Sequence, residues 1–198
     1  MGDLELIVGC MFSGKTNELF RRIRMELVSE RKVQLFKPLL DNRYSQNLIV
    51  SHDKLNLEAV PVSSTNELIQ KLDYDTEVVG IDEIQFFDDK IIDFCLNQTN
   101  KNIIASGLNL NFRGEPFKFR NSSRDIGDLL PYAVIKYLRA ICKYKEDSKI
   151  CGRSADFSQR LIEGKPAPYN SELILVGSKD KYEARCKQHF YIEKPNEK

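Results

Sequence analysis

Hydrophobic residues along the first half of the chain form short continuous runs that alternate with amphipathic stretches. The continuous runs predict buried strands at residues 4–8, 33–36, 78–81 and 102–106, with shorter strands at 48–50 and 59–62. Apolar residues at helical spacing predict helices over residues 16–29, 64–72 and 88–97. Strands that alternate with helices are typical of an α/β fold, a mostly parallel sheet with helices on both faces. Ligands of such folds bind at the carboxyl edge of the sheet.

The pattern changes after Gly107. Residues 108–128 are rich in Asn, Arg, Gly and Phe and have no clear period, so we predict a long functional loop. From Cys142 onward Lys, Ser, Gly and Pro are frequent, and the only clear strand is predicted at residues 173–176. With 198 residues, the chain is too short for two full α/β domains. We therefore expect a main domain over residues 1–141, a small lobe over 142–192 and a tail over 193–198.

The first predicted strand leads directly into a phosphate-loop motif. The motif reads Gly9-Cys10-Met11-Phe12-Ser13-Gly14-Lys15-Thr16 and precedes the first predicted helix. In such a loop, backbone N–H groups surround the phosphates and glycines allow the chain to approach them closely. The lysine reaches the β- and γ-phosphates, and the threonine hydroxyl offers a ligand to Mg²⁺. Because the strand and the helix are both in place, the motif predicts binding of a nucleoside triphosphate with Mg²⁺.

Two neighbouring carboxylates, Asp82 and Glu83, follow the buried strand predicted at residues 78–81. In phosphate-loop proteins an acidic residue at this position holds Mg²⁺ or its water shell, which makes Asp82 the candidate. Glu83 could then accept the proton of an attacking hydroxyl. The alternative is that both side chains belong to a solvated strand end, and the two roles could also be exchanged.

Four residues of the predicted lobe have the donor types of a zinc site. Cys142 and Cys151 are separated by eight residues, and Cys186 and His189 by two. Three thiolates and one imidazole suit tetrahedral Zn²⁺, and a closed set of four protein ligands would be structural rather than catalytic. The wide spacing of the first pair leaves scattered structural cysteines as the alternative interpretation.

Composition and charge argue against some function classes. The 30 basic and 29 acidic residues give a net charge of +1, which does not attract nucleic acid or anionic membranes. No apolar stretch approaches the roughly 20 residues needed to cross a bilayer, and the chain begins with a strand rather than a charged leader. We therefore expect a cytoplasmic protein without a nucleic-acid or membrane partner. Disulfides are not expected there, and Cys10 and Cys95 are predicted to pack as small apolar residues.

The motifs, taken in their order, resemble those of a known enzyme family. They are the phosphate loop, Asp82-Glu83-Ile84-Gln85-Phe86-Phe87, the segment from Gly107 to Phe117, and Val176-Gly177 with Tyr182 before Cys186. Over residues 4–190 the chain is similar to thymidine kinases of the cytosolic, zinc-containing type. The resemblance implies ATP-dependent phosphorylation of thymidine or deoxyuridine at the 5′-hydroxyl, in nucleotide salvage. It also implies a P-loop domain that carries a small zinc lobe, and a homotetramer.

The resemblance further implies roles for individual residues. Glu83 is the general base, and the nucleotide and metal site comprises the phosphate loop with Asp41, Asn42, Arg43, Asp82 and Gln85. The nucleoside site comprises Met11, Glu83, Phe86, Leu108, Phe112, Ser158, Leu173, Ile174, Leu175, Val176, Gly177 and Tyr182. Backbone groups of residues 173–177 read the thymine edge, and a loop over residues 153–172 forms the lid. The structural Zn²⁺ is held by Cys142, Cys151, Cys186 and His189.

Two positions depart from the family pattern. Asn109 stands where the family often has Asp, which puts in doubt any carboxylate function there. The interval between Cys142 and Cys151 exceeds the family's two-residue spacing, as if residues 144–149 had been inserted. A surface insertion costs little closure entropy, so a site of three cysteines and one histidine is still permitted. A second interpretation is a P-loop ATPase whose zinc lobe binds nucleic acid, which the near-neutral charge disfavours.

Overall fold

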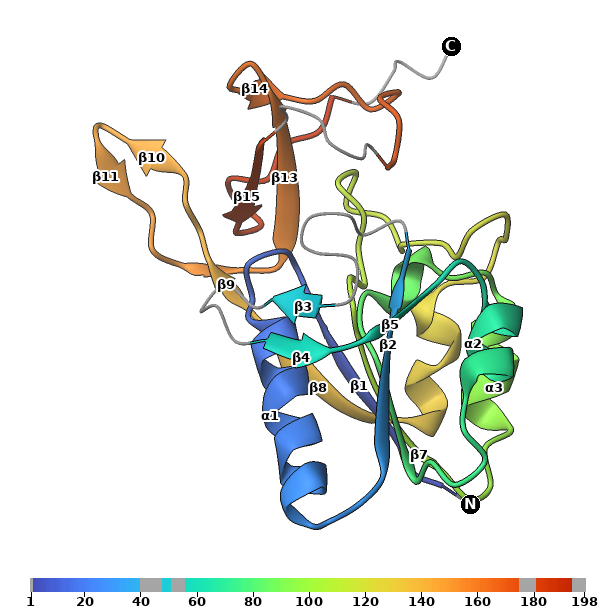
Figure 1. Cartoon of the computed structure of the whole chain (residues 1–198). Helices are drawn as coiled ribbons and strands as arrows, with labels where there is room; N and C mark the ends of the chain where they lie inside the picture. The colour runs from blue at the N-terminus through green and yellow to red at the C-terminus, as the bar shows by residue number, and fades with distance from the viewer. Residues whose placement is uncertain (1, 40–47, 51–55, 175–180, 194–198) are drawn as a thin grey trace.

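The computed structural model describes residues 2–39, 48–50, 56–174 and 181–193. Its centre is a parallel sheet of six strands in the order β5-β2-β6-β7-β1-β8 (Figure 1). In chain order these strands are β1 (Leu4–Gly9), β2 (Val33–Pro38), β5 (Val60–Val62), β6 (Val78–Ile81), β7 (Asn102–Gly107) and β8 (Val134–Leu138). A short antiparallel pair, β3 (Leu48–Val50) with β4 (Asn56–Glu58), precedes β5. The predicted α/β sheet is confirmed, whereas β4 and β8 were not predicted.

Helices cover both faces of the sheet. Helix α1 (Lys15–Val28) lies on one face, and α2 (Thr65–Lys71) and α3 (Lys90–Leu96) lie on the other (Figure 1). Three single 3₁₀ turns, η1 (Ile84–Phe86), η2 (Ile126–Asp128) and η3 (Leu130–Tyr132), interrupt the loops. All three predicted helices are therefore confirmed within one or two residues at each end.

The continuous apolar strands are buried because each face of the sheet has its own core. Along β1, Leu6 and Val8 pack in the cluster on the side of α2 and α3, whereas Ile7 packs with Leu19 and Phe20 of α1. Side chains alternate between the two faces of a strand, so a strand covered on both faces is apolar at nearly every position. This two-sided burial fixes the sheet, and with it the carboxyl edge at which its loops meet.

The start of α2 is capped by a side chain. Ser64 Oγ accepts a hydrogen bond from Glu67 N at 3.2 Å. The Glu67 carboxylate reaches back to Ser63 N, at 2.7 Å, rather than to the N-H of Ser64. In α3, Ile91 and Ile92 are buried, and so is Cys95, which was predicted to pack as a small apolar residue.

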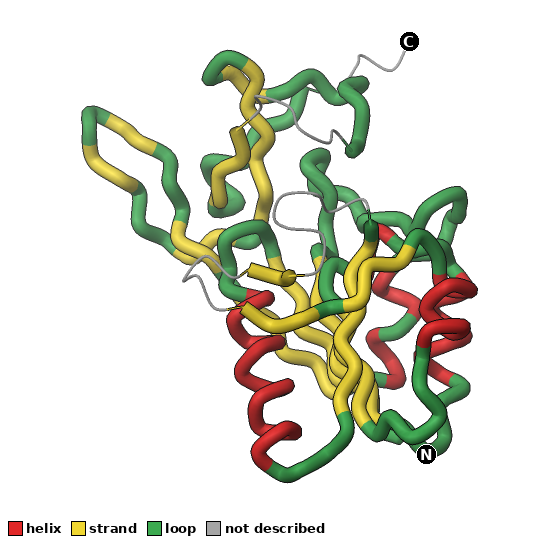
Figure 2. The backbone as a smooth tube through the Cα atoms, in the orientation of Figure 1, coloured by secondary structure: helices red, strands yellow, loops and turns green. Residues whose placement is uncertain are grey.

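The C-terminal lobe, defined here as residues 140–174 and 181–193, is built from antiparallel strands (Figure 2). Its strands are β9 (Ala140–Ile141), β10 (Lys145–Glu146), β11 (Lys149–Ile150), β12 (Ser154–Ala155), β13 (Phe157–Ile162), β14 (Lys165–Pro166) and β15 (Lys181–Arg185). They form a β9-β12 pair, a β10-β11 hairpin and a β14-β13-β15 sheet. The rest of the molecule is called the sheet region below.

Two predictions for this lobe were wrong. Residues 153–172 are not a continuous loop, because they contain β12, β13 and β14. Residues 173 and 174 are not in a strand, and the remainder of that predicted strand, residues 175 and 176, lies outside the described residues. The sequence hides β13 because Ser158, Gln159 and Arg160 are polar residues that the fold nevertheless buries. Among the helices that the structure describes, none has the length and apolar character of a membrane span.

Candidate active site and metal centre

The phosphate loop forms a compact turn between β1 and α1. Gly9 has φ +155°, and a Cβ atom there would lie 2.1 Å from Leu138 O, so only glycine fits. Lys15 is almost buried and its Nζ donates to Cys10 O at 2.8 Å, which folds its side chain across the loop. Ser13 Oγ is buried and has no hydrogen-bond partner among the described residues. A tight loop with a lysine and an unused hydroxyl at a helix N-terminus is suited to bind an anion such as a phosphate group.

The carboxylate pair lies at the same edge of the sheet as the phosphate loop. Strand β7 is flanked by β6 and β1, so Asp82 after β6 and the loop after β1 lie on either side of the end of β7. Asp82 is 3% exposed, and one of its oxygens accepts a hydrogen bond from Ser106 Oγ in β7. Glu83 has the left-handed conformation φ 49°, ψ 46°, which is unusual for a non-glycine residue and frequent at functional sites.

Gln85 connects the two loops that follow β6 and β7. Its Nε2 donates to Glu83 Oε2 at 2.6 Å, and its Oε1 accepts from Leu108 N at 3.0 Å. Because a backbone N–H can only donate, the second bond fixes which end of the amide faces Glu83. A Cβ atom at Gly107 would lie 2.6 Å from Gln85 Oε1, so this close packing requires glycine. Gln85 therefore holds the Glu83 carboxylate in one orientation.

The phosphate loop also contacts the C-terminal lobe. Met11 N donates to Ser158 Oγ of β13 at 2.9 Å, and Cys10 Sγ donates to Ala155 O of β12 at 3.2 Å. Burial raises the pKa of the Cys10 thiol, which keeps it protonated as this donor. The structure thus brings together Met11 and Ser158, two residues predicted to bind the nucleoside.

Two aromatic residues predicted to line the nucleoside site, Phe112 and Phe86, pack against other side chains. Phe112 is 3% exposed, and the guanidinium carbons of Arg113 and Arg160 lie 5.4 and 5.2 Å from its ring centroid. Phe86 packs edge-on against Phe117, with ring centroids 5.6 Å apart.

The remaining predicted residues of the nucleotide and nucleoside sites are only partly described. Tyr182 lies on β15 opposite Arg160 of β13, and Leu173 and Ile174 lie in the segment that follows β14. Asp41, Asn42, Arg43, Leu175, Val176 and Gly177 lie outside the described residues.

The four predicted metal ligands lie together. The ligand atoms of Cys142, Cys151, Cys186 and His189 are all within 4.8 Å of one another. His189 Nδ1 lies 3.7 Å from Cys142 Sγ and 3.5 Å from Cys186 Sγ. Zn–S bonds of about 2.3 Å and Zn–N bonds of about 2.0 Å at tetrahedral angles separate the ligand atoms by roughly 3.5–3.8 Å. The cluster therefore has the donor set and the spacing that suit a closed tetrahedral zinc site.

The long interval between Cys142 and Cys151 is a β-hairpin formed by β10 and β11. Its turn contains Asp147 and Ser148, both with positive φ, and at its base Cys151 N donates to Tyr144 O at 2.8 Å. The hairpin projects away from the rest of the lobe (Figure 1). Because it returns the chain to its starting point, the extra residues do not separate the two thiols.

Three residues that support the site were not predicted from the sequence. Ser106 binds Asp82, while Arg113 and Arg160 approach the Phe112 ring. Ser106 had a weak signal, because it is the one polar residue in the run at 103–106 and lies near the end of the strand. Arg160 had none, because a buried arginine cannot be distinguished by pattern from a solvated one.

Comparison with known proteins gives the same result over nearly the whole chain. The family model described as thymidine kinase matches residues 2–190. A thymidine kinase of Mesoplasma florum is 44% identical over 202 aligned residues, covering 98% of this chain and 94% of the relative. A thymidine kinase of Thermococcus kodakarensis is 43% identical over 199 aligned residues, covering 96% and 95% of the two chains. The chain belongs to the thymidine kinase family.

Proposed function

We propose that this enzyme transfers the γ-phosphoryl group of ATP to the 5′-hydroxyl of thymidine, and of deoxyuridine, and so supplies the nucleoside monophosphate in nucleotide salvage. The observation that carries the proposal is the juxtaposition of the phosphate loop with Glu83, on either side of the end of β7, in a member of the thymidine kinase family. A phosphate-binding loop beside a carboxylate is the arrangement that transfer of a phosphoryl group to an alcohol requires.

The phosphate loop would bind the triphosphate of ATP. Backbone N–H groups of residues 9–16 and the N-terminus of α1 would face the phosphates, and Lys15 would leave Cys10 O to contact the β- and γ-phosphates. The Thr16 hydroxyl and the Asp82 carboxylate would hold Mg²⁺ or its water ligands. The ion would neutralise charge that develops on the phosphate oxygens. Asp41, Asn42 and Arg43 are proposed to complete the phosphate site.

Glu83 would act on the 5′-hydroxyl. Its carboxylate accepts a hydrogen bond from Gln85 Nε2, which orients it, and would accept the hydroxyl proton as the general base. The proton would leave the oxygen as the O–P bond forms, and the leaving ADP would carry away the former bridging oxygen. Phosphoryl transfer passes through a loose transition state, so orientation of the hydroxyl contributes as much as its deprotonation.

The nucleoside would lie between the phosphate loop and the C-terminal lobe. Proposed contacts come from Met11, Phe86, Leu108, Phe112, Ser158, Tyr182 and residues 173–177. The hydrogen bond between Met11 N and Ser158 Oγ supports this placement, because it joins two of these residues across the boundary between the lobe and the sheet region. Backbone groups of residues 173–177 would read the thymine edge, since an unmatched base would leave buried donors or acceptors unpaired at a cost of about 1–3 kcal/mol each.

The cysteine and histidine cluster would hold one structural Zn²⁺. The four ligands fill a tetrahedral coordination sphere, so the ion would fold the lobe rather than take part in the chemistry. All five cysteines are free, as expected for a protein of a reducing compartment, and we propose that the enzyme is cytoplasmic.

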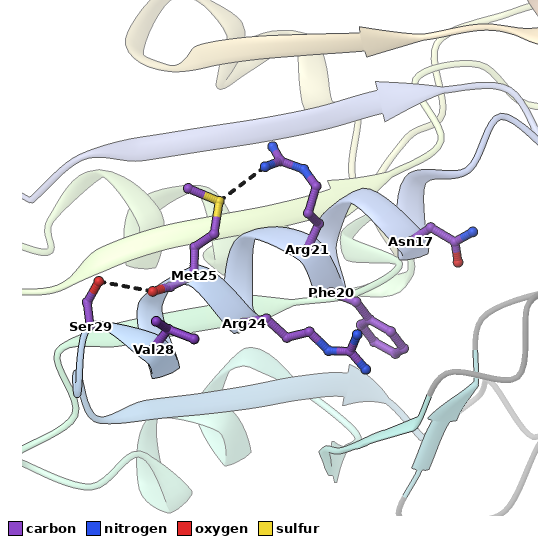
Figure 3. Close-up of a pocket in the computed structure, with 7 residues that line it drawn as sticks. All are labelled: Asn17, Phe20, Arg21, Arg24, Met25, Val28 and Ser29. Atoms are coloured by element: carbon purple, nitrogen blue, oxygen red, sulfur yellow. Dashed lines mark hydrogen bonds between the residues drawn. The ribbon is translucent and has the colours of Figure 1, made fainter.

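The enzyme is further proposed to be a homotetramer. Two separate apolar surfaces support this assignment. One is the outer face of α1, where a groove is lined by Asn17, Phe20, Arg21, Arg24, Met25, Val28 and Ser29 (Figure 3). The other is β8 at the edge of the sheet, where Val134 is 68% exposed and Ile135 is 47% exposed. A closed tetramer with two-fold axes needs two distinct self-complementary interfaces, and these two surfaces can supply them.

The test of the proposed function is a nucleoside-dependent kinase assay. Purified enzyme with ATP and Mg²⁺ should release ADP only when thymidine or deoxyuridine is added, and the product should be the 5′-monophosphate. Absence of nucleoside-dependent ADP release from protein that binds both ligands would reject the proposal. ATP hydrolysis stimulated by DNA or RNA, with no nucleoside dependence, would instead favour a nucleic-acid-dependent ATPase.

A further inference from the structure

Arg160 of β13 is the largest side chain that is fully buried in the described part of the chain, at 1% exposure. Its guanidinium carbon lies 5.2 Å from the centroid of the Phe112 ring, and its Nη1 donates to Glu172 O at 2.5 Å. Arginine is rarely buried, because each of its five N–H donors loses water and must find an acceptor. A buried arginine is therefore expected to make contacts that a smaller apolar residue at the same position could not make.

These contacts of Arg160 with Phe112 and Glu172 connect three segments that are distant in the sequence. Phe112 lies in the loop after β7, Arg160 lies in β13, and Glu172 lies in the segment after β14. Glu172 immediately precedes residues 173–177. The backbone supports the same connection, because Ala167 N donates to Arg160 O at 3.0 Å.

A second arginine makes a parallel set of contacts. The guanidinium carbon of Arg113 lies 5.4 Å from the Phe112 ring centroid and 4.8 Å from that of Tyr169, and Nη2 donates to Ser171 O at 3.0 Å. Each arginine thus joins the same ring to a carbonyl of the same short segment. Tyr169 OH in turn donates to Glu115 Oε1 at 2.5 Å, which ties that segment to the loop after β7 once more.

We propose that Arg160 is a positioning residue that sets the distance between Phe112 and the segment ending at Ile174, and thereby shapes the site for the nucleoside base. The inference rests on the proposed function, because Phe112, Leu173 and Ile174 are among the residues proposed there to contact the base. Arginine can do this with one side chain because its planar guanidinium group stacks on a ring through its face and donates hydrogen bonds in its plane. Lysine keeps the charge but lacks the plane, and methionine lacks both.

The experiment compares Arg160→Met and Arg160→Lys with Arg31→Met. Arg31 provides a matched control, since its side chain is 44% exposed. It also lies just before the start of β2, at the amino end of the sheet and away from the carboxyl edge where the site lies. In Arg160→Met, KM for thymidine should rise about tenfold or more, as expected for loss of a hydrogen bond from a charged donor. KM for ATP should stay within about twofold, because the phosphate loop is retained. Arg160→Lys should lie between the wild type and Arg160→Met, and Arg31→Met should match the wild type.

Two further measurements separate positioning from general stability. Hydrogen exchange of the amides in residues 167–174 should be faster in Arg160→Met than in the wild type, while exchange in β1 and β7 stays the same. Zinc content and the thermal midpoint should stay close to those of the wild type, since a buried charge replaced by an apolar residue of similar volume is often neutral for stability.

The possible outcomes distinguish this inference from the proposed function. Wild-type enzyme that does not phosphorylate thymidine would reject the proposed function itself. An active wild type together with an unchanged thymidine KM in Arg160→Met would overturn only the inference. The inference would be overturned equally if KM for thymidine and KM for ATP rose together while the thermal midpoint fell. If Arg160→Met does not fold, Arg160→Lys must show the thymidine-selective rise alone, and equal changes for both substrates would refute it.

Discussion

The sheet region and the C-terminal lobe are stabilised in different ways. The sheet region buries large side chains on both faces of β1, in one core under α1 and another under α2 and α3. The buried cluster of the lobe consists of small residues, namely Cys10, Ala140, Cys142, Ala155, Ala184 and Cys186. Small side chains remove little apolar surface from water, so this cluster contributes little hydrophobic free energy. The proposed zinc ligands would therefore stabilise the lobe, whereas the sheet region is held by its own two cores.

The two regions also divide the chemistry. The residues that would act on phosphate lie in loops held by the two cores, and a rigid sheet keeps such loops in place. The lobe supplies Ser158, which accepts a hydrogen bond from the phosphate loop, and Arg160, which would position the proposed base site. Cys10 belongs to the small-residue cluster of the lobe although it lies in the phosphate loop. Loss of the metal is accordingly expected to affect nucleotide binding through this shared packing.

The largest expected effect comes from removing a metal ligand. Cys186→Ala should abolish zinc binding, because three ligands leave an open coordination position, and the lobe should lose hydrogen-exchange protection in β13 and β15. Protection in β1 and β7 should persist, since the sheet region has its own cores. The matched control is Cys95→Ala, which removes a buried thiol of the sheet region. Burial raises the pKa of this thiol to about 12. Retained zinc, or equal loss of protection in both regions, would contradict the comparison.

The next effect tests the chemistry of the sheet region alone. Lys15→Met should lower kcat/KM for phosphoryl transfer by about 10²–10³-fold, the range for removal of one group that stabilises transition-state charge. Zinc content and exchange in the lobe should not change, because Lys15 lies in the loop between β1 and α1, whereas the four predicted metal ligands all lie in the lobe. Steady-state kinetics and elemental analysis measure both. Lys71→Met serves as the control, since Lys71 makes an exposed ion pair with Glu67 in α2.

A smaller loss is expected from Glu83→Gln. The amide keeps the size of the side chain but cannot accept the hydroxyl proton, and we expect kcat to fall by roughly 10²-fold, at the low end for a general base. KM values for both substrates should change little. The comparison with Asp82→Asn sharpens the assignment, because that variant should instead require a higher Mg²⁺ concentration for half-maximal activity. If the two variants exchange these phenotypes, the two carboxylates have exchanged roles.

Much of the sheet region could be predicted from the sequence, whereas much of the lobe could not. Strands such as 78–81 are apolar at every position because they are buried from both sides, and that pattern is local. In β13 the buried residues Ser158 and Arg160 are polar, and their burial depends on partners far away in the sequence, Met11 and Glu172. The four predicted metal ligands could be chosen by residue type, but the proximity of Cys142 and Cys151 depends on the β10-β11 hairpin. Neither fact is visible in a local pattern.

The smallest expected effect concerns an ion-pair network on the sheet region, and it tests whether charge matters to a region held by apolar packing. Hydrogen bonds from Arg21, at 2.7 Å, and from Arg22, at 2.9 Å, lower the pKa of Glu18 from 4.5 to about 2. A lowered folded-state pKa means that the charged form stabilises the fold above pH 4.5, and that this contribution disappears as the pH falls toward 2.

Glu18→Gln should therefore lower the free energy of unfolding at pH 7 by about 0.5–1 kcal/mol, as for partly screened helix pairs. Urea titrations of both proteins should converge between pH 4.5 and pH 2. Glu26→Gln, which removes a single pair with Arg31 at 3.2 Å, should cost less. A difference between wild type and Glu18→Gln that persists at pH 2 would show that packing of the side chain, rather than its charge, stabilises α1.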